Sequence, residues 1–224
     1  MYLKLITSTI ILTALSACDS KSNQTNESDS SKEIETKMTE ITNDPHSFAR
    51  PEQAVVKHLN WNAKIDFENK LIEATATYSI DNKEGVDTIY LDSKDLIIKE
   101  INRDDSDSTL NYKSESFNNY LGTKLSIPIS PQTKQISIKY KTSEGADALQ
   151  FLDPQQTAGK KHPFLFTQSQ AILARSWIPC QDSPGIRFTY EATVQVPKGM
   201  MALMSAENPT STNEDGVYTF EMKQ

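Results

Sequence analysis

After about Asp44, apolar and polar residues alternate in short runs, with the two-residue period of β-strands. From Ile72 to Ile80 every second residue is apolar or aromatic, and the residues between them are polar. Such a segment is expected to form an antiparallel strand with one buried face. The same alternation recurs in three further segments: 125–129, 136–140 and 188–196.

Turn-forming residues separate these segments, and no long amphipathic helix is evident after residue 43. Residues 217–222 also have the composition of a strand. We therefore predict an all-β domain whose antiparallel sheets pack as a sandwich or saddle.

The first residues have the features of an export signal. Lys4 provides a positive charge, and the mostly apolar run 5–15 is shorter than the roughly 20 residues that a membrane-spanning helix requires. The sequence Leu15-Ser16-Ala17-Cys18 then resembles a bacterial lipobox, in which small residues precede the cleavage point and the cysteine thiol accepts a diacylglyceryl group. We predict that residues 1–17 are a lipoprotein signal peptide and that Cys18 is the lipidation site. The alternative is an ordinary cleavage site beside a chance cysteine.

A lipobox implies a protein exported to the bacterial cell envelope and lipid-anchored to a membrane facing the periplasm, since several acyl chains make anchoring durable. Residues 18–43 are rich in Ser, Thr, Asn, Lys and Glu and poor in apolar residues, so they are predicted to form a flexible tether. The folded domain is then expected to be 44–224. Only Lys223 and Gln224 follow the last predicted strand, and we expect this β-domain to be incomplete at its carboxyl end.

The charge and cysteine content exclude two classes of protein. The formal net charge of −7 over 224 residues provides no basic surface for the phosphate backbone, so no nucleic-acid partner is expected. The chain has two cysteines, and lipidation of Cys18 leaves Cys180 alone, which excludes a disulfide framework. Cys180 is expected to be a small buried residue rather than a reactive thiol.

Metal-ligating patterns are missing from the sequence. The three histidines, His46, His58 and His162, do not have the spacing of a zinc site, so no metal site is expected in this chain. The aspartate-rich segment 102–108 has oxygen ligands that calcium would accept, but it lacks EF-hand spacing. A solvated acidic turn is the favoured interpretation of that segment.

The run from Phe164 to Gln170 carries the candidate binding chemistry. As one extended strand, it would place Phe164, Phe166, Gln168 and Gln170 on one face and Ser169 on the other. Buried amides need several hydrogen-bond partners, so two aromatic rings and two amides on one face indicate a surface that grips a peptide. Composition alone leaves a second interpretation open, an edge strand whose polar face lies in water.

These residues also carry a family resemblance. The runs 149–153, 157–171 and 174–184 resemble the amino-terminal domain of the zinc aminopeptidases related to aminopeptidase N and leukotriene A hydrolase. The resemblance implies that residues 167–171 line the substrate cleft, with Gln168, Ser169 and Gln170 as the substrate-binding segment whose glutamine amides contact the main chain of the peptide. Arg175 and Asp182 are expected to form a structural ion pair or to cap a loop of the cleft wall.

The family's zinc motif, H-E-x-x-H, and its G-x-M-E-N strand do not occur in the chain. The resemblance therefore implies one zinc ion in a full-length enzyme, bound by a missing catalytic domain, with no catalytic residue in this chain and no activity of the chain alone. The predicted function is the substrate-cleft domain of an exported, lipid-anchored zinc aminopeptidase that removes amino-terminal residues from peptides. The alternative is a non-enzymatic periplasmic β-sandwich lipoprotein that binds peptides or a partner protein.

Overall fold

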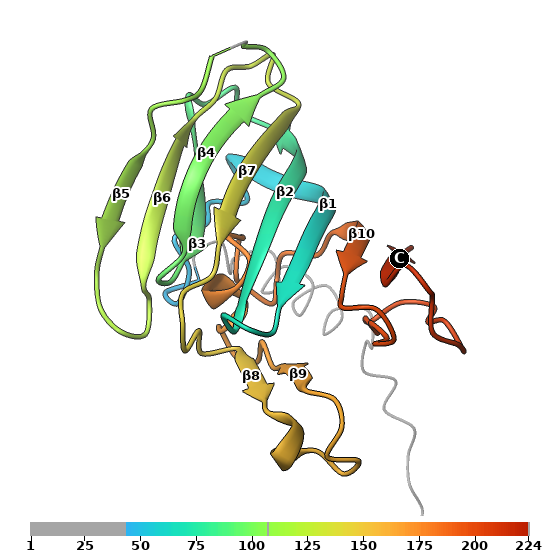
Figure 1. Cartoon of the computed structure of the whole chain (residues 1–224). Helices are drawn as coiled ribbons and strands as arrows, with labels where there is room; N and C mark the ends of the chain where they lie inside the picture. The colour runs from blue at the N-terminus through green and yellow to red at the C-terminus, as the bar shows by residue number, and fades with distance from the viewer. Residues whose placement is uncertain (1–43, 107, 224) are drawn as a thin grey trace, which may run out of the picture. The chain divides into compact units, whose positions relative to one another are not determined.

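The computed structural model describes residues 44–106 and 108–223, so the predicted signal peptide, the tether and Cys18 lie outside the described residues. Eleven strands and two single-turn 3₁₀ helices make up the described part (Figure 1). The strands are β1 (Ala54–Asp66), β2 (Leu71–Asn82), β3 (Thr88–Ser93), β4 (Ile97–Arg103), β5 (Lys113–Ser116), β6 (Thr123–Pro128), β7 (Gln135–Lys141), β8 (Leu149–Leu152), β9 (Phe164–Thr167), β10 (Thr189–Gln195) and β11 (Val217–Met222). The 3₁₀ helices are η1 (Pro154–Gln156) and η2 (Ala174–Ser176). The prediction of an all-β fold is confirmed.

Six strands form the main sheet, in the order β11-β10-β1-β2-β7-β4, and three more form a second sheet, β3-β6-β5. The apolar residues of β2 that alternate from Ile72 to Ile80 are all buried, as their period predicts. Ile89 and Leu91 of β3, with Leu125 of β6, belong to the same hydrophobic cluster as the inner face of the main sheet. The two sheets therefore share one core, as predicted for a sandwich.

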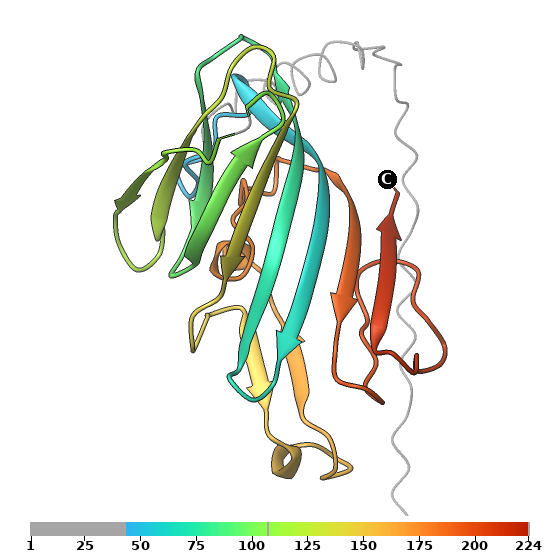
Figure 2. The ribbon, with the colours of Figure 1, turned by 45° about the horizontal axis from the view of Figure 1, so that its top comes forward.

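One strand pair departs from the predicted antiparallel pairing. Strand β10 pairs with β1 in parallel, in a register that runs from His58 opposite Thr189 to Lys64 opposite Gln195. Between β9 and β10 the chain crosses from the hairpin back to the main sheet through a long irregular segment, so β10 enters the sheet beside β1 in the same direction (Figure 2). Alternation determines which face of a strand is buried, but it does not determine the direction of the neighbouring strand.

Strands β8 and β9 pair only with each other and form a hairpin at one end of the main sheet (Figures 1 and 2). A two-stranded hairpin needs support from other elements to be stable. Here the ring of Phe151 packs edge-on against Phe67, with ring centroids 5.7 Å apart, and Lys70 pairs with Asp153 at 3.0 Å. Both partners lie in the β1–β2 turn, which therefore holds the hairpin in place.

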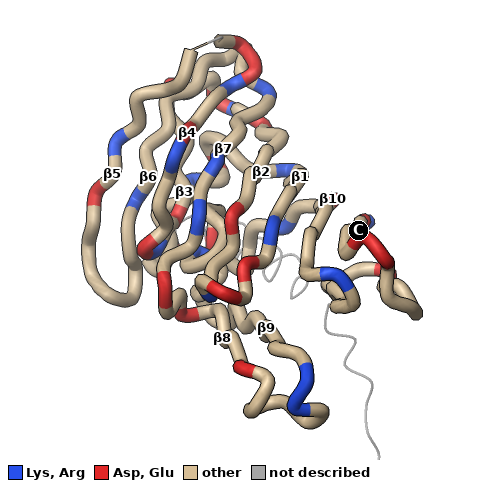
Figure 3. Tube along the Cα trace, in the orientation of Figure 1, with Lys and Arg blue, Asp and Glu red and all other residues tan. Residues whose placement is uncertain are grey.

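Lysine and arginine residues are interspersed with aspartate and glutamate along the strands of the main sheet (Figure 3). On β2 the charged, threonine and serine side chains lie on the outer face, since Glu73 is exposed while Ile72 and Ala74 are buried. Within 44–106 and 108–223, no helix has the length and apolar character needed to cross a membrane.

Candidate functional site

The predicted single strand from Phe164 to Gln170 is wrong in its length, because β9 ends at Thr167. At Gln168 the chain leaves the hairpin and turns, and the side-chain Oε1 of Gln168 accepts a hydrogen bond from the backbone N–H of Gln170 at 3.1 Å. This bond gives the backbone a local partner in place of a neighbouring strand. The two glutamines therefore lie on a loop that follows the strand.

Hydrogen bonds fix this loop at both ends. The backbone N–H of Gln168 donates to the carbonyl of Ala148 at 2.9 Å, and the N–H of Ala148 donates to the hydroxyl of Ser176 at 3.0 Å. Within the loop, the N–H of Leu173 donates to the carbonyl of Ser169 at 2.8 Å. The buried residue Ala148 thus bonds to Gln168 at the start of the loop and to Ser176 of η2 after it, which keeps an irregular backbone in a defined conformation.

Exposure alternates from Gln168 to Gln170, although Thr167 at the end of β9 is exposed as well. Gln168 and Gln170 are exposed, whereas Ser169 is half-buried and its hydroxyl accepts a hydrogen bond from the indole N–H of Trp177 at 3.0 Å. The peptide bond between Gln170 and Ala171 is cis. The two amide side chains are consequently available to a ligand, while the serine between them points toward the body of the domain.

The two aromatic side chains of β9 also face solvent. Phe164 is 51% exposed and Phe166 is 47% exposed, while Leu165 between them packs against the core. Both rings and both amides are therefore exposed to solvent, while the predicted grouping on one face stays a prediction. Large exposed apolar groups in a small domain are typical of surfaces that contact a ligand or a partner.

A buried arginine anchors the segment that follows the loop. The side chain of Arg175 has no exposed surface, and its Nε donates to the carboxylate of Asp182 at 3.0 Å. Its other nitrogens donate to the carbonyls of Leu121 at 2.9 Å and His46 at 2.7 Å, and Nη1 lies 3.6 Å from the carboxylate of Asp92. The predicted structural pair of Arg175 and Asp182 is confirmed, and the guanidinium also joins segments that are far apart in the sequence.

Asp92, which lies beside Arg175, is also buried, and both of its carboxylate oxygens accept hydrogen bonds. Its carboxylate accepts hydrogen bonds from the hydroxyl of Ser47 at 2.5 Å, from the N–H of Phe48 at 2.8 Å and from the N–H of Asp182 at 2.8 Å. Its backbone pairs with that of Cys180 in an isolated β-bridge. A buried carboxylate with this many donors is a structural group that joins β3 to the chain on both sides of it.

Burial also governs the ionisation of the neighbours of Arg175. Burial raises the pKa of Asp182 above its ordinary value, although the hydrogen bonds from Arg175 act in the opposite direction. Burial raises the pKa of the Cys180 thiol well above its ordinary value, and the nearby carboxylates of Asp182 and Asp92 raise it further. The thiolate is the reactive form of cysteine, so Cys180 is the inert buried residue that the sequence indicated.

The described residues do not provide a zinc site. Across 44–106 and 108–223, no three side chains of His, Cys, Asp or Glu converge as metal ligands would. His46 lies beside Asp44, with 3.3 Å between Nδ1 and the carboxylate, and Nδ1 of His58 is 2.7 Å from the hydroxyl of Thr189. These histidines belong to separate local contacts, so the residues described do not fit a zinc ion.

In the aspartate-rich turn, the carboxylate of Asp105 binds other groups of the protein. The carboxylate of Asp105 accepts hydrogen bonds from the hydroxyls of Ser130 at 2.5 Å and Thr133 at 3.0 Å, and it pairs with Arg103 at 2.8 Å. The hydrogen bond from Ser130 lowers the pKa of Asp105, with a smaller contribution from Thr133. Hydroxyl groups of the turn between β6 and β7 thus hold Asp105 in place.

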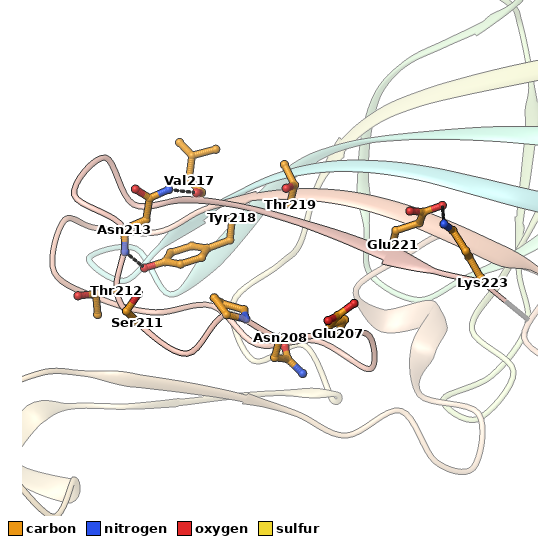
Figure 4. A pocket seen from close by; sticks show the side chains of 11 residues that line it. Glu207, Asn208, Ser211, Thr212, Asn213, Val217, Tyr218, Thr219, Glu221 and Lys223 are labelled. Atoms are coloured by element: carbon orange, nitrogen blue, oxygen red, sulfur yellow. Dashed lines mark hydrogen bonds and ion pairs between the residues drawn. The ribbon is translucent and has the colours of Figure 1, made fainter.

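A separate hollow of about 750 Å³ lies beside β11, at the edge of the main sheet (Figure 4). The backbone N–H of Asn213 donates to the hydroxyl of Tyr218, and its side-chain amide donates to the carbonyl of Val217 at 2.9 Å. Glu221 pairs with Lys223 at 3.2 Å along the same strand. None of the predicted substrate-binding residues lines this hollow.

Residues 55–224 match the family of the Peptidase M1 N-terminal domain. The chain belongs to this family. This chain is 41% identical to leukotriene A-4 hydrolase of Xenopus laevis over 169 residues, which cover 73% of this chain and 27% of that protein. It is 35% identical to leucine aminopeptidase 2 of Lodderomyces elongisporus over 181 residues, which cover 80% of this chain and 28% of that protein.

Solved structures agree with this assignment. This chain superimposes on native yeast LTA4 hydrolase with a TM-score of 0.70 and 26% identity, and the superposition covers 85% of this chain and 30% of the yeast chain. An M1 zinc metallopeptidase from Deinococcus radiodurans, at 18% identity and a TM-score of 0.54, shares the fold. The chain spans less than a third of the length of the two curated relatives and of the yeast structure.

Sequence reasoning missed three residues that hold the loop or the segment after it: Trp177 and Tyr140 support the loop, and Asp92 binds the segment that contains Asp182. Trp177, Tyr140 and Asp92 come from different parts of the chain, and no local pattern joins them to Gln168 or Gln170. The only available signal was the position of Trp177 within the run 174–184, which carries the family resemblance.

Proposed function

We propose that this chain is the substrate-cleft domain of an aminopeptidase and that Gln168 and Gln170 hold the main chain of a peptide substrate. The observation that carries the proposal is the exposed pair of amides on a loop whose backbone is anchored at both ends. A relative named leucine aminopeptidase 2 supports a peptide as the ligand. In the Deinococcus structure the related metallopeptidase is bound to a Tyr-Ser-Ala substrate.

The chemistry of the two side chains restricts their role. A glutamine amide donates and accepts hydrogen bonds, as a peptide group does, but it does not titrate or serve as a usual metal ligand. Gln168 and Gln170 are therefore assigned to orienting the peptide, and a fixed orientation accelerates a reaction by removing the entropic cost of alignment. Ser169 lies between the two glutamines, and its hydrogen bond with Trp177 holds the segment against the domain.

The zinc ion of the complete enzyme is assigned to a catalytic domain outside this chain, because the described residues do not fit a zinc site. When bound there, zinc would supply the activation of water and the polarisation of the scissile carbonyl. The residues of this chain bind and orient the substrate, and no catalytic residue is assigned to them.

The first test compares this 224-residue chain with the complete polypeptide encoded by its reading frame and the sequence downstream of it. The complete polypeptide is expected to contain H-E-x-x-H, to bind one zinc ion and to hydrolyse aminoacyl anilides. The chain alone is expected to carry less than stoichiometric zinc and no such activity. Stoichiometric zinc in the chain alone, with activity that a chelator removes, would contradict the proposal. An unrelated gene downstream would favour the alternative, a non-enzymatic lipoprotein that binds peptides.

We also propose that the protein is exported and lipid-anchored through Cys18. Replacing Cys18 with serine removes the acyl acceptor, so the variant is expected to leave the membrane fraction or to remain unprocessed. Fractionation of cells grown with labelled palmitate measures both effects, and Cys180→Ser is the matched control because that thiol is buried. Equal membrane recovery without label on either form would contradict lipid attachment.

A further inference from the structure

We propose that Trp177 is a positioning residue for peptide binding and acts on the Gln168–Gln170 segment through the hydroxyl of Ser169. The inference rests on the proposed function and adds to it the device that fixes the binding loop. It begins with one contact: the indole N–H of Trp177 donates to the Ser169 hydroxyl at 3.0 Å. Ser169 lies between the two glutamines, so this bond acts at the centre of the proposed binding segment.

Trp177 is itself held by the core of the main sheet. Its ring packs edge-on against Trp61 of β1, with ring centroids 5.3 Å apart and the ring planes perpendicular at 90°. Its carbonyl accepts a hydrogen bond from the Tyr140 hydroxyl at 2.9 Å, and that hydroxyl accepts one from the Trp61 indole N–H, also at 2.9 Å. Tyr140 lies on β7, so two strands of the main sheet fix both the ring and the backbone of Trp177.

The path from the sheet to the loop is continuous. Trp61 and Tyr140 are buried, Trp177 and Ser169 are half-buried, and Gln168 and Gln170 are exposed. A binding group is effective when neighbours hold it in the productive geometry, so that less conformational entropy is lost when the ligand binds. The Trp177–Ser169 bond provides such support, because it prevents the segment between the glutamines from turning outward.

The consequence concerns binding rather than the chemical step. Loss of the bond should leave the amides present but less well ordered, which raises KM for a peptide and leaves kcat nearly unchanged. A general loss of stability would lower the amount of active enzyme and would not separate KM from kcat. The effects of substituting Ser169 and Trp177 should not add, because either substitution removes the same hydrogen bond.

The experiment uses the complete zinc-loaded enzyme and a tripeptide substrate. Ser169→Ala and Trp177→Phe are each expected to raise KM about three- to fivefold, the size of effect expected for one hydrogen bond, with kcat within about twofold. The double variant is expected to be no worse than the more affected single variant. Ser169→Thr keeps the hydroxyl and is expected to restore KM to within about twofold of the starting enzyme.

Two reference variants separate the possible explanations. Tyr218→Phe removes a buried hydroxyl that contacts Met200 and Asn213 on another part of the domain, so it should reduce stability without changing KM. Gln170→Ala reports on the proposed function itself. If Gln170→Ala raises KM but Ser169→Ala and Trp177→Phe do not, the positioning role is overturned and the proposed function stands. An equal rise in KM with Tyr218→Phe also overturns it, and no effect of Gln170→Ala overturns the proposed function.

Discussion

Replacing Arg175 with methionine is expected to lower the free energy of unfolding by about 3 to 5 kcal/mol, the cost of removing one partner from a buried ion pair. The guanidinium has no exposed surface and lies beside two carboxylates, that of Asp92, which is buried, and that of Asp182, which is 11% exposed. Methionine fills a similar volume but removes the positive charge beside both carboxylates and the donor to three backbone carbonyls, those of His46, Leu121 and Asp182. The loss is therefore expected to exceed what the missing contacts alone would cause.

Urea denaturation of the full chain, followed by tryptophan fluorescence, measures this loss. Arg187 is an exposed arginine in the same part of the chain, and Arg187→Met should change the free energy of unfolding by no more than about 0.5 kcal/mol. Arg175→Lys serves as a second variant if the methionine variant does not fold, because it keeps the charge but loses the planar arrangement of donors. Equal stability of Arg175→Met and Arg187→Met would show that the buried cluster does not stabilise the domain.

The same comparison has a predicted pH dependence. Burial raises the pKa of Asp182 and the hydrogen bonds of Arg175 oppose this, so removal of the guanidinium should raise that pKa further. A carboxyl group whose folded-state pKa is raised favours the folded state at low pH, and this contribution is lost as the pH rises through the folded pKa. The stability gap between Arg175→Met and the unchanged protein should therefore be smaller near pH 5 than near pH 7.

The strands and their buried faces could be predicted from the sequence because their information is local. Alternation from Ile72 to Ile80 determines the inner face of β2, and the structure buries those positions. The parallel pairing of β1 and β10 could not be predicted in this way, because it depends on how the irregular segment between β9 and β10 returns to the sheet.

The candidate site likewise combines contacts that a local sequence pattern predicts with contacts that only the fold creates. Arg175 and Asp182 lie close in the sequence, and their pairing was predicted. Asp92 lies far from both and joins them only through the fold, so neither its burial nor its partners follow from a local pattern. The expected strand through Gln168 and Gln170 failed because Gln168 bonds to the backbone of Gln170 and ends the extended conformation, an effect of side-chain chemistry that a two-residue period does not contain.

The most informative prediction for function concerns Gln170. In the complete enzyme, Gln170→Ala is expected to lower kcat/KM for peptides by about 1 to 3 kcal/mol, the cost of removing a hydrogen-bond partner from a polar group in a site that excludes water. The side chain of Gln170 is exposed, whereas Gln168 also supports the turn, so Gln170 separates binding from structure more cleanly. Zinc content and the free energy of unfolding are expected to remain unchanged.

Two control substitutions test whether the effect is specific to Gln170. Gln195→Ala removes an exposed glutamine from β10 and should leave kcat/KM unchanged. Ser169→Ala removes a support of the loop rather than a group that contacts the peptide, so its effect should be smaller than that of Gln170→Ala. This order follows from the structure, because Gln170 faces solvent while Ser169 faces Trp177. If Ser169→Ala impairs catalysis as much as Gln170→Ala, or if neither changes it, the segment is a structural turn and peptide binding must be assigned to other residues.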